Sequence, residues 1–452
     1  MTILYFIIAL GVLVFIHEFG HFIVAKKQKI GVEKFSLGFG PKIFGFKRGE
    51  TEYMLSALPL GGYVKLRGED PDEADHNDPA SFSARPIWHR IKVVVAGPCM
   101  NLLLALVLLP VVFMIGRMEP AYFQQPPVVL GVTVKSVAET AGLQRGDKLV
   151  AINQVAYTTW KPLLDFLLLH GGETIHLQLQ RDGVDLEREM TIPAASGSAP
   201  GTLGIEPNFF VGNEAEVDGV MPDSPAAAAG FQVGDRIVEI NGQKVSGWME
   251  MTEMVNHSEG KILDLVLERA KAPLHIQVTP RKDATSGRWL LGIKKDYDKK
   301  GALMVERKYP FGQAIIEGSK ENLKLAKMTL EVLGRLVTGK LSYKTLGGPI
   351  RIAQASGMAA AAGFSHFLYF MAFLSIQLGL LNLLPLPVLD GGHLFFYTIE
   401  AIQGRPLSMK ARGIMEQVGF FLLLGLMLLI TVNDVDSVWG FHSLFEKIKH
   451  IF

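Results

Sequence analysis

The stretch VLVFIHEFGHFIVAKK, from Val12 to Lys27, largely decides what kind of fold this chain adopts. It belongs to a run from Ile3 to Ala25 that is apolar almost throughout. At about 1.5 Å rise per residue, a helix of this length nearly crosses the ~30 Å hydrocarbon core of a bilayer. Lysines follow the run rather than precede it, and no small-residue cleavage site is evident. We therefore expect a retained transmembrane helix and not a signal peptide.

The motif HEFGH within this helix carries the groups of a zinc hydrolase. His17 and His21 are four residues apart, so both imidazoles lie on one helical face, where they can bind one zinc ion. Catalytic zinc needs a third protein ligand and a water molecule, and Glu18 can accept the proton of that water. The motif also occurs by chance in soluble helices. In an apolar span, however, ionisable side chains are costly unless they are paired or functional, which favours a function or a bound metal.

Three further apolar runs predict transmembrane helices, near residues 91–115, 364–389 and 414–432. A content of 49% hydrophobic and 20% charged residues suits a chain with both membrane and soluble parts. The 45 basic residues balance the 44 acidic ones, so no net field favours nucleic acid as a partner. Basic residues concentrate at 26–92 and 405–412, which the positive-inside rule places in the cytoplasm. Residues 117–363 are then expected on the opposite side.

Two stretches in that long segment match at an offset of 88 residues. AGLQRGDKLVAIN begins at Ala141 and AGFQVGDRIVEIN at Ala229, and LGI recurs at the same offset, at 203–205 and 291–293. A Gly-Asp turn before alternating apolar residues is typical of a turn that leads into a β-strand, so we expect two copies of one domain. The pattern resembles PDZ domains in the circularly permuted bacterial arrangement. Such a pair either binds a peptide carboxylate at the LGI loops or acts as a steric filter.

A second polar constellation is NLLPLPVLDGGH, from Asn382 to His393, near the end of the third apolar run. Pro385 and Pro387 interrupt a helix and leave carbonyl groups that must face protein or a water-lined cavity. Asp390 is then a carboxylate at membrane depth and a natural third zinc ligand, which would end an out-to-in span. His393 is the alternative ligand, although it lies past the helix break.

These features together resemble the RseP-type bacterial site-2 proteases, which are intramembrane zinc metalloproteases with tandem PDZ domains. The resemblance covers the whole chain and rests on a specific combination of motifs. These are HExxH, GFGP at 38–41, PLGGYVK at 59–65, AGPCMN at 96–101, the domain pair, and NLLPLP before LDG at 389–391.

The resemblance implies one catalytic Zn²⁺ bound by His17, His21 and Asp390, with Glu18 as the base. It also implies that Asn382 contacts the substrate backbone. Related proteins often carry a second Asn about a turn earlier, where this chain has Gln377, which either substitutes for it or bonds a helix neighbour. A β-hairpin-like loop at 33–65 is expected to dip into the membrane and to pair its edge strand with an unwound substrate.

The implied activity is cleavage of transmembrane segments in pre-trimmed single-span proteins, as part of regulated intramembrane proteolysis in the envelope stress response. The implied substrates are an anti-sigma factor and signal-peptide remnants, and the setting is the bilayer of a bacterial inner membrane. One rival is a non-enzymatic, membrane-anchored PDZ scaffold, which has no use for Glu18. The other rival is a zinc carrier or channel, which has no use for tandem PDZ domains.

The expected fold is a polytopic α-helical membrane protein with four transmembrane helices, a membrane-associated β-hairpin loop and two periplasmic α/β PDZ domains. Residues 311–337 have a basic amphipathic pattern, which suits either the outer membrane interface or a place beneath the PDZ pair. In chain order the expected segments are helix 1 with HExxH (1–25), the cytoplasmic β-loop region (26–90), helix 2 (91–116), PDZ 1 (126–207), PDZ 2 (212–295), the periplasmic amphipathic helical region (296–363), helix 3 with LDG (364–395), helix 4 (414–432) and a periplasmic tail (433–452).

Overall fold

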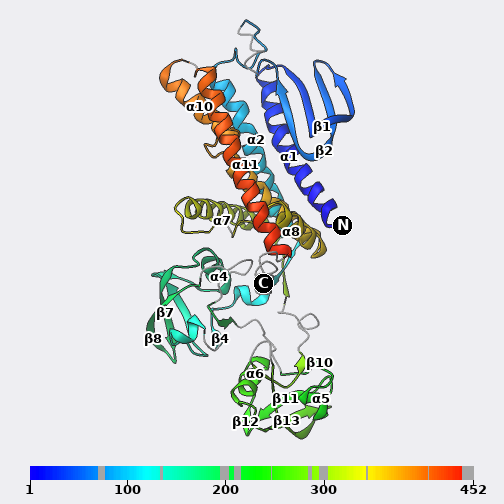
Figure 1. Cartoon of the computed structure of the whole chain (residues 1–452), viewed down its shortest axis with the longest axis vertical. Helices are drawn as coiled ribbons and strands as arrows, with labels where there is room; N and C mark the ends of the chain where they lie inside the picture. The colour runs from blue at the N-terminus through cyan, green and yellow to red at the C-terminus, as the bar shows by residue number, and fades with distance from the viewer. Residues whose placement is uncertain are drawn as a thin grey trace, which may run out of the picture. The chain divides into compact units, whose positions relative to one another are not determined.

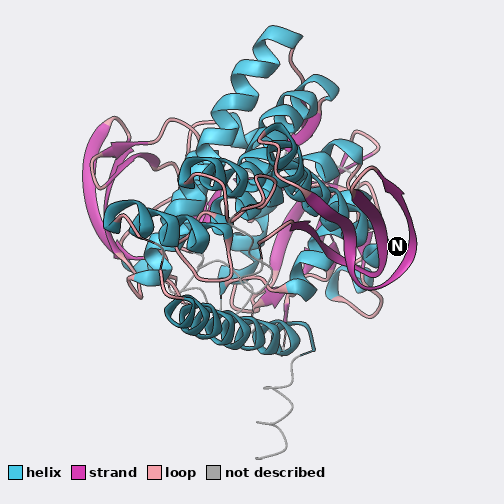
Figure 2. Ribbon diagram, turned by 90° about the horizontal axis from the view of Figure 1, so that it is seen from above, coloured by secondary structure: helices cyan, strands magenta, loops and turns pink. Residues whose placement is uncertain are grey.

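The computed structural model describes residues 1–69, 77–132, 136–193, 203–207, 215–245, 247–283, 288–294, 304–342, 345–405 and 407–439. It has two compact units, Met1–Arg117 with Arg307–Phe452, and Met118–Glu306. The first unit is mainly helical and the second is built around short β-sheets (Figures 1 and 2). Most of the predicted tail, from residue 440 onward, lies outside the described residues.

Four helices among the described residues are long and apolar enough to cross a membrane. They are α1 (Thr2–Lys27), α2 (Ile87–Ile115), α9 (Phe364–Asn382) and α11 (Met409–Trp439). The prediction of four spanning helices is confirmed in number and approximate position. Helices α2 and α11 extend beyond the predicted apolar runs because polar residues continue both helices at their ends.

Helix α2 lies at the centre of the first unit and packs against α1, α9, α7 (Phe311–Val337) and α10 (Asp390–Gln403). Small residues let it approach α1 closely, since a Cβ atom on Gly20 would lie 2.4 Å from the carbonyl oxygen of Ala96. A buried apolar cluster that includes Ala105, Leu109 and Ile376 joins α2 to α9. The metal-binding motif of α1 is therefore held against a densely packed neighbour.

The third predicted span is not one helix to residue 395. Helix α9 ends at Asn382, and α10 begins at Asp390 after a loop that contains Pro385 and Pro387. The predicted interruption by the two prolines is thus confirmed, but Asp390 starts a new helix instead of ending a span.

Strands β1 (Val32–Arg48) and β2 (Thr51–Leu66) form the antiparallel hairpin predicted at 33–65. Both strands fold back on themselves, so that Phe35 has Val64 as its partner on one side and Tyr53 on the other. Residues 62–64 consequently lie at one edge of the sheet and residues 42–48 at the other. Three large apolar side chains of this second edge are strongly exposed, Ile43 (68%), Phe44 (66%) and Phe46 (54%), which suits contact with lipid.

Two helices follow the second unit in the chain, where one amphipathic region was predicted. Helix α7 begins and ends at the predicted residues 311 and 337, and α8 spans Pro349–Ala361. Helix α7 packs on α2, where Asn322 Nδ2 donates to the carbonyl oxygen of Ala105 at 3.2 Å. The buried carboxylate of Asp434 in α11 accepts backbone N–H groups of Gly348, Ile350 and Arg351 at 3.0–3.1 Å, which ties α11 to the first turn of α8.

The second unit contains the predicted repeat as two α/β arrangements with the same strand order. Each has a four-stranded antiparallel sheet, a helix of ten residues and a separate strand pair. The first copy comprises β4 (Val129–Val132), α3 (Val137–Thr140), β5 (Lys148–Ile152), β6 (Val155–Ala156), α4 (Trp160–Leu169), β7 (Thr174–Arg181), β8 (Val184–Thr191) and β9 (Ile205–Pro207). The second comprises β10 (Gly219–Val220), α5 (Pro225–Ala228), β11 (Arg236–Ile240), β12 (Gln243–Lys244), α6 (Trp248–His257), β13 (Leu263–Arg269), β14 (Ala272–Val278) and β17 (Ile293–Lys294). The short strands β3 (Arg117–Pro120), β15 (Arg281–Lys282), β16 (Trp289–Leu290) and β18 (Met304–Arg307) and the 3-10 helix η2 (Ala121–Gln124) complete the strands and turns.

The Gly-Asp pair of the repeat has the same role in both copies. The buried carboxylate of Asp147 accepts two hydrogen bonds from Arg181, at 2.7 and 2.9 Å, and one from the backbone N–H of Gln144. Asp235 accepts the equivalent bonds from Arg269 and Gln232, again 88 residues later. Burial acts to raise the pKa of Asp147, but the hydrogen bonds from Arg181 and Gln144 outweigh it and lower the pKa below its ordinary value.

We expect Asp147→Asn to destabilise the first copy by about 2 kcal/mol, because it leaves the Arg181 guanidinium without its charged partner. The same argument predicts acid sensitivity. Since the folded pKa is depressed, the stabilisation is complete above the unfolded pKa near ~3.9 and is lost as pH falls through the folded pKa. Calorimetry of the full chain from pH 7 toward pH 3 measures both effects. The exposed Asp185→Asn is the control, and equal behaviour of the two variants would contradict the prediction.

Candidate metal centre

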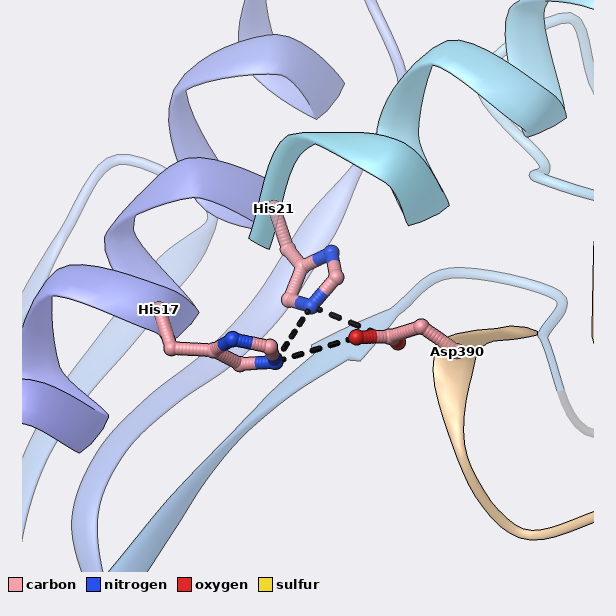
Figure 3. Close-up of side chains that lie close together, drawn as sticks. All are labelled: His17, His21 and Asp390. Carbon is pink, nitrogen blue, oxygen red and sulfur yellow. Dashed lines mark hydrogen bonds and ion pairs between the residues drawn. The ribbon is translucent and has the colours of Figure 1, made fainter. Parts of the chain in front are cut away.

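Three side chains from two helices converge on one point (Figure 3). His17 and His21 come from α1, and Asp390 comes from the first turn of α10. The Nε2 atoms of the two histidines lie 3.2 Å apart. Asp390 places Oδ2 3.1 Å from His17 Nε2 and Oδ1 3.6 Å from His21 Nε2. Among the described residues, this is the group whose ligand atoms all lie within 4.8 Å of one another.

The chemistry of this donor set fits a zinc ion. Two imidazole nitrogens and a carboxylate oxygen are the usual ligands of catalytic zinc, and they leave a fourth position for water or substrate. Bonds of about 2.0–2.2 Å from a central ion to each atom are compatible with separations of 3 to 4 Å between the donor atoms. The three residues therefore fit a zinc ion in the kind of their donor atoms and in their spacing.

Glycine residues leave room for the two imidazole rings and for the loop before Asp390. A Cβ atom on Gly97 of α2 would lie 2.3 Å from His21 Nε2 and 2.9 Å from His17 Cε1, so any side chain there would collide with both imidazoles. Gly391 and Gly392, which follow Asp390, have a similar function, because a Cβ on either would lie within 2.4 Å of the carbonyl oxygens of the preceding loop. The glycines of AGPCMN and LDGGH are thus steric requirements of the site.

The loop before Asp390 is strained. Val388 has a φ of 92°, in a region that β-branched residues rarely adopt. Such a conformation persists only where the surroundings enforce it, and it is typical of functional sites. Because Val388 lies two residues before Asp390 and lines the same cavity, the strain is stored where the third candidate ligand is positioned.

The imidazole of His21 is oriented by α2. Its Nδ1 atom lies 2.9 Å from the carbonyl oxygen of Val93, a group that can only accept a hydrogen bond. The ring proton is therefore on Nδ1, and the lone pair of Nε2 points toward the convergence point. No motif in the sequence marks Val93, so its contribution depends on the packing of α1 against α2.

A cavity of about 260 Å³ opens onto the three candidate ligands. Glu18 lines this cavity beside them, and residues 63, 64 and 66 of the β2 edge form another part of its wall. Gly62 brings the edge close, since a Cβ atom there would lie 3.2 Å from Cγ of Glu18. Glu18 therefore shares this cavity with the candidate metal ligands and with the edge of β2.

The remaining predicted residues differ in their placement. Asn382, the last residue of α9, lines the cavity. Gln377 lies five residues earlier in α9, is half-buried and is not among the lining residues. His393 lines the cavity but stands apart from the three converging ligands, with Nδ1 3.3 Å from a guanidinium nitrogen of Arg412. Arg412 of α11 also lines the cavity, a contact that the sequence did not reveal because it depends on how α11 packs.

The chain is similar to known proteins over nearly its whole length. The family model described as peptidase family M50 matches residues 5–426. A relative from Escherichia coli, named regulator of sigma-E protease RseP, is 35% identical over 453 residues, which cover 96% of this chain and 98% of the relative. Protease RseP of Yersinia pestis is 34% identical and covers the same shares. A Vibrio cholerae protein named as a candidate zinc metalloprotease is 34% identical over 95% of this chain and 97% of its own length.

Among solved structures, the PDZ domain of an SdrC-like protein from Listeria monocytogenes is 20% identical, with a TM-score of 0.18. It covers 20% of this chain and 94% of that domain.

Proposed function

The chain belongs to peptidase family M50, a family of intramembrane metalloproteases, and we propose that His17, His21 and Asp390 hold its one catalytic zinc ion. The observation that carries this proposal is the convergence of these three side chains in a cavity that Glu18 shares. Zinc in such a site supplies Lewis acidity toward water and toward the scissile carbonyl. The chain's own residues then have to position the substrate and move the proton.

Glu18 is the proposed general base. Its carboxylate accepts the proton of the attacking water and delivers it to the nitrogen of the leaving peptide segment. Asn382 is the proposed contact to the substrate backbone, because its amide can both donate and accept hydrogen bonds within the cavity. For Gln377 we propose a role within the helix bundle, since it is not among the lining residues.

The edge of β2 is the proposed docking site for the scissile segment. A transmembrane helix satisfies its backbone groups internally, so its peptide bonds become accessible only after local unwinding. Residues 63 and 64 lie at a sheet edge and border the cavity, so an unwound substrate that pairs with them replaces its lost hydrogen bonds beside Glu18.

Single-span membrane proteins that another protease has already trimmed are the proposed substrates. The names of the relatives in Escherichia coli and Yersinia pestis connect those proteins to the regulation of sigma-E. On this basis we propose an anti-sigma factor as one substrate, and signal-peptide remnants as another, because both present a single span.

The proposed orientation places the metal site toward the cytoplasm and the PDZ-like unit in the periplasm of an inner membrane. Basic residues near Lys26 and near Arg405 support it through the positive-inside rule. A phosphatase reporter, which is active only outside the cytoplasm, should be active when it is fused within residues 194–202. A reporter that is active only in the cytoplasm should be active when it is fused at Gln403. The reverse pattern would place the two ends of the site at different depths and overturn the proposal.

The proposed function is tested with purified full-length protein in detergent. We expect close to one zinc ion per chain and cleavage within the span of a model single-span substrate. Removal of zinc with a chelator should abolish cleavage, and added Zn²⁺ should restore it, because the ion supplies the Lewis acid. Undiminished cleavage without metal would refute a metal-dependent mechanism, and zinc binding without cleavage of any single-span substrate would favour a scaffold.

A further inference from the structure

Asn101 of α2 lies beside Nδ1 of His17, the ring nitrogen that does not face the other candidate ligands. Its side chain is buried, with the residue 0% exposed, and Nδ2 lies 3.1 Å from His17 Nδ1. Its Oδ1 atom is buried and has no hydrogen-bond partner. The residue's backbone oxygen accepts a hydrogen bond from Ser375 of α9 at 2.7 Å. Asn101 therefore contacts both α1 and α9 from α2, while its side-chain oxygen makes no hydrogen bond.

The position of the proton on His17 decides whether this histidine can bind metal. The Nε2 atom of His17 faces His21 and Asp390, so Nε2 must keep a free lone pair and the ring proton must be on Nδ1. A protonated Nδ1 needs an acceptor. For His21 the carbonyl oxygen of Val93 fills this role at 2.9 Å. For His17 the neighbouring group is the Asn101 amide, whose nitrogen can only donate.

We propose that Asn101 is a positioning residue, whose Oδ1 accepts the Nδ1–H of His17 and so fixes the tautomer that binds metal. This inference rests on the metal site proposed above. The oxygen and nitrogen of a carboxamide are nearly the same size, so a half-turn of the amide exchanges them without moving other heavy atoms. Oδ1 then occupies the place of Nδ2, about 3 Å from Nδ1, within the ordinary range for such a bond.

The half-turn does not increase the number of hydrogen bonds that the amide makes, because Nδ2 then occupies the place where Oδ1 had no partner. Its benefit lies in the bond to a metal-binding ring, so metal binding and amide orientation favour each other. Gly97 and Asn101 lie one turn apart on α2, where Gly97 leaves room for the two imidazole rings and Asn101 provides the acceptor. Together with Val93 they explain why AGPCMN lies opposite HEFGH: one α2 segment orients both histidines.

The test compares zinc affinity in purified full-length variants, measured by competition with a chelator of known affinity. Asn101→Leu keeps a similar shape but removes the acceptor, and we expect zinc binding about 10- to 100-fold weaker. Asn101→Asp keeps an acceptor and cannot donate, so its affinity should stay within about 3-fold of wild type, as in carboxylate–histidine–zinc arrangements. Ser375→Ala is the matched control, because it removes the hydrogen bond to the Asn101 backbone and leaves the amide untouched.

A second measurement separates positioning from packing. The rise in Tm on adding zinc to the chelated protein should shrink in Asn101→Leu, whereas the Tm of the chelated protein should change little. Wild-type affinity in Asn101→Leu would overturn the inference, and so would equal losses in the Leu and Asp variants. If wild-type protein binds no zinc, the metal site fails; if wild type binds zinc and Asn101→Leu does so equally, only the positioning role fails.

Discussion

Glu18→Gln is expected to abolish cleavage while zinc remains bound. Glutamine has nearly the same shape as glutamate, so the cavity, the strand edge and the three ligands stay in place. The variant cannot accept the proton of the attacking water, and a general base contributes roughly 10²- to 10⁴-fold to the rate. We therefore expect turnover of a single-span substrate to fall by about 10³-fold or more, measured beside the zinc content of the same preparation.

A matched control is Glu52→Gln on the hairpin. Glu52 is an exposed carboxylate of β2 that pairs with Lys42, outside the residues that line the cavity. Its replacement should leave both zinc content and cleavage near wild type. Turnover in Glu18→Gln comparable to that of Glu52→Gln would remove Glu18 from the mechanism, and loss of zinc in Glu18→Gln would make it a ligand instead of a base.

The candidate site residues were predictable from the sequence where an ionisable side chain is energetically costly in an apolar span. His17, Glu18 and His21 stand out because they interrupt an apolar run, and Asp390 stands out for the same reason. The structure brings the candidate ligand atoms of His17, His21 and Asp390 within 4.8 Å of one another, although His21 and Asp390 are 369 positions apart in the sequence. The repeat was equally visible, because its offset of 88 residues persists from the Gly-Asp turns to the LGI segments.

The sequence did not reveal contacts that depend on helix packing. Val93 and Arg412 carry no motif of their own, and their places beside His21 and in the cavity follow from how α2 and α11 pack. The start of α10 at Asp390 was also missed, since periodicity cannot place a helix boundary within a loop that contains two prolines. The double fold of β1 and β2 was missed because pairings such as Phe35 with both Val64 and Tyr53 are tertiary in origin.

Asp390→Ala is expected to lose both zinc and cleavage, which would distinguish a ligand from the base Glu18. The variant removes one of three donors, so zinc affinity should fall by more than the roughly 10- to 100-fold typical of outer-shell partners. His17 and His21 would keep their orientation on α1 but could hold the ion through two nitrogens only. Chelator competition gives the affinity, and cleavage of the single-span substrate by the same preparation gives the activity.

His393→Ala is the decisive comparison, because His393 is the other imidazole or carboxylate of the LDGGH segment that could complete the site. It lies one helical turn after Asp390 in α10 and contacts Arg412 rather than the two α1 histidines. We expect His393→Ala to retain zinc with an affinity within about 10-fold of wild type, the lower limit for an outer-shell residue. Loss of zinc in His393→Ala together with retention in Asp390→Ala would exchange their roles and show that α10 turns to present its second polar residue to the metal.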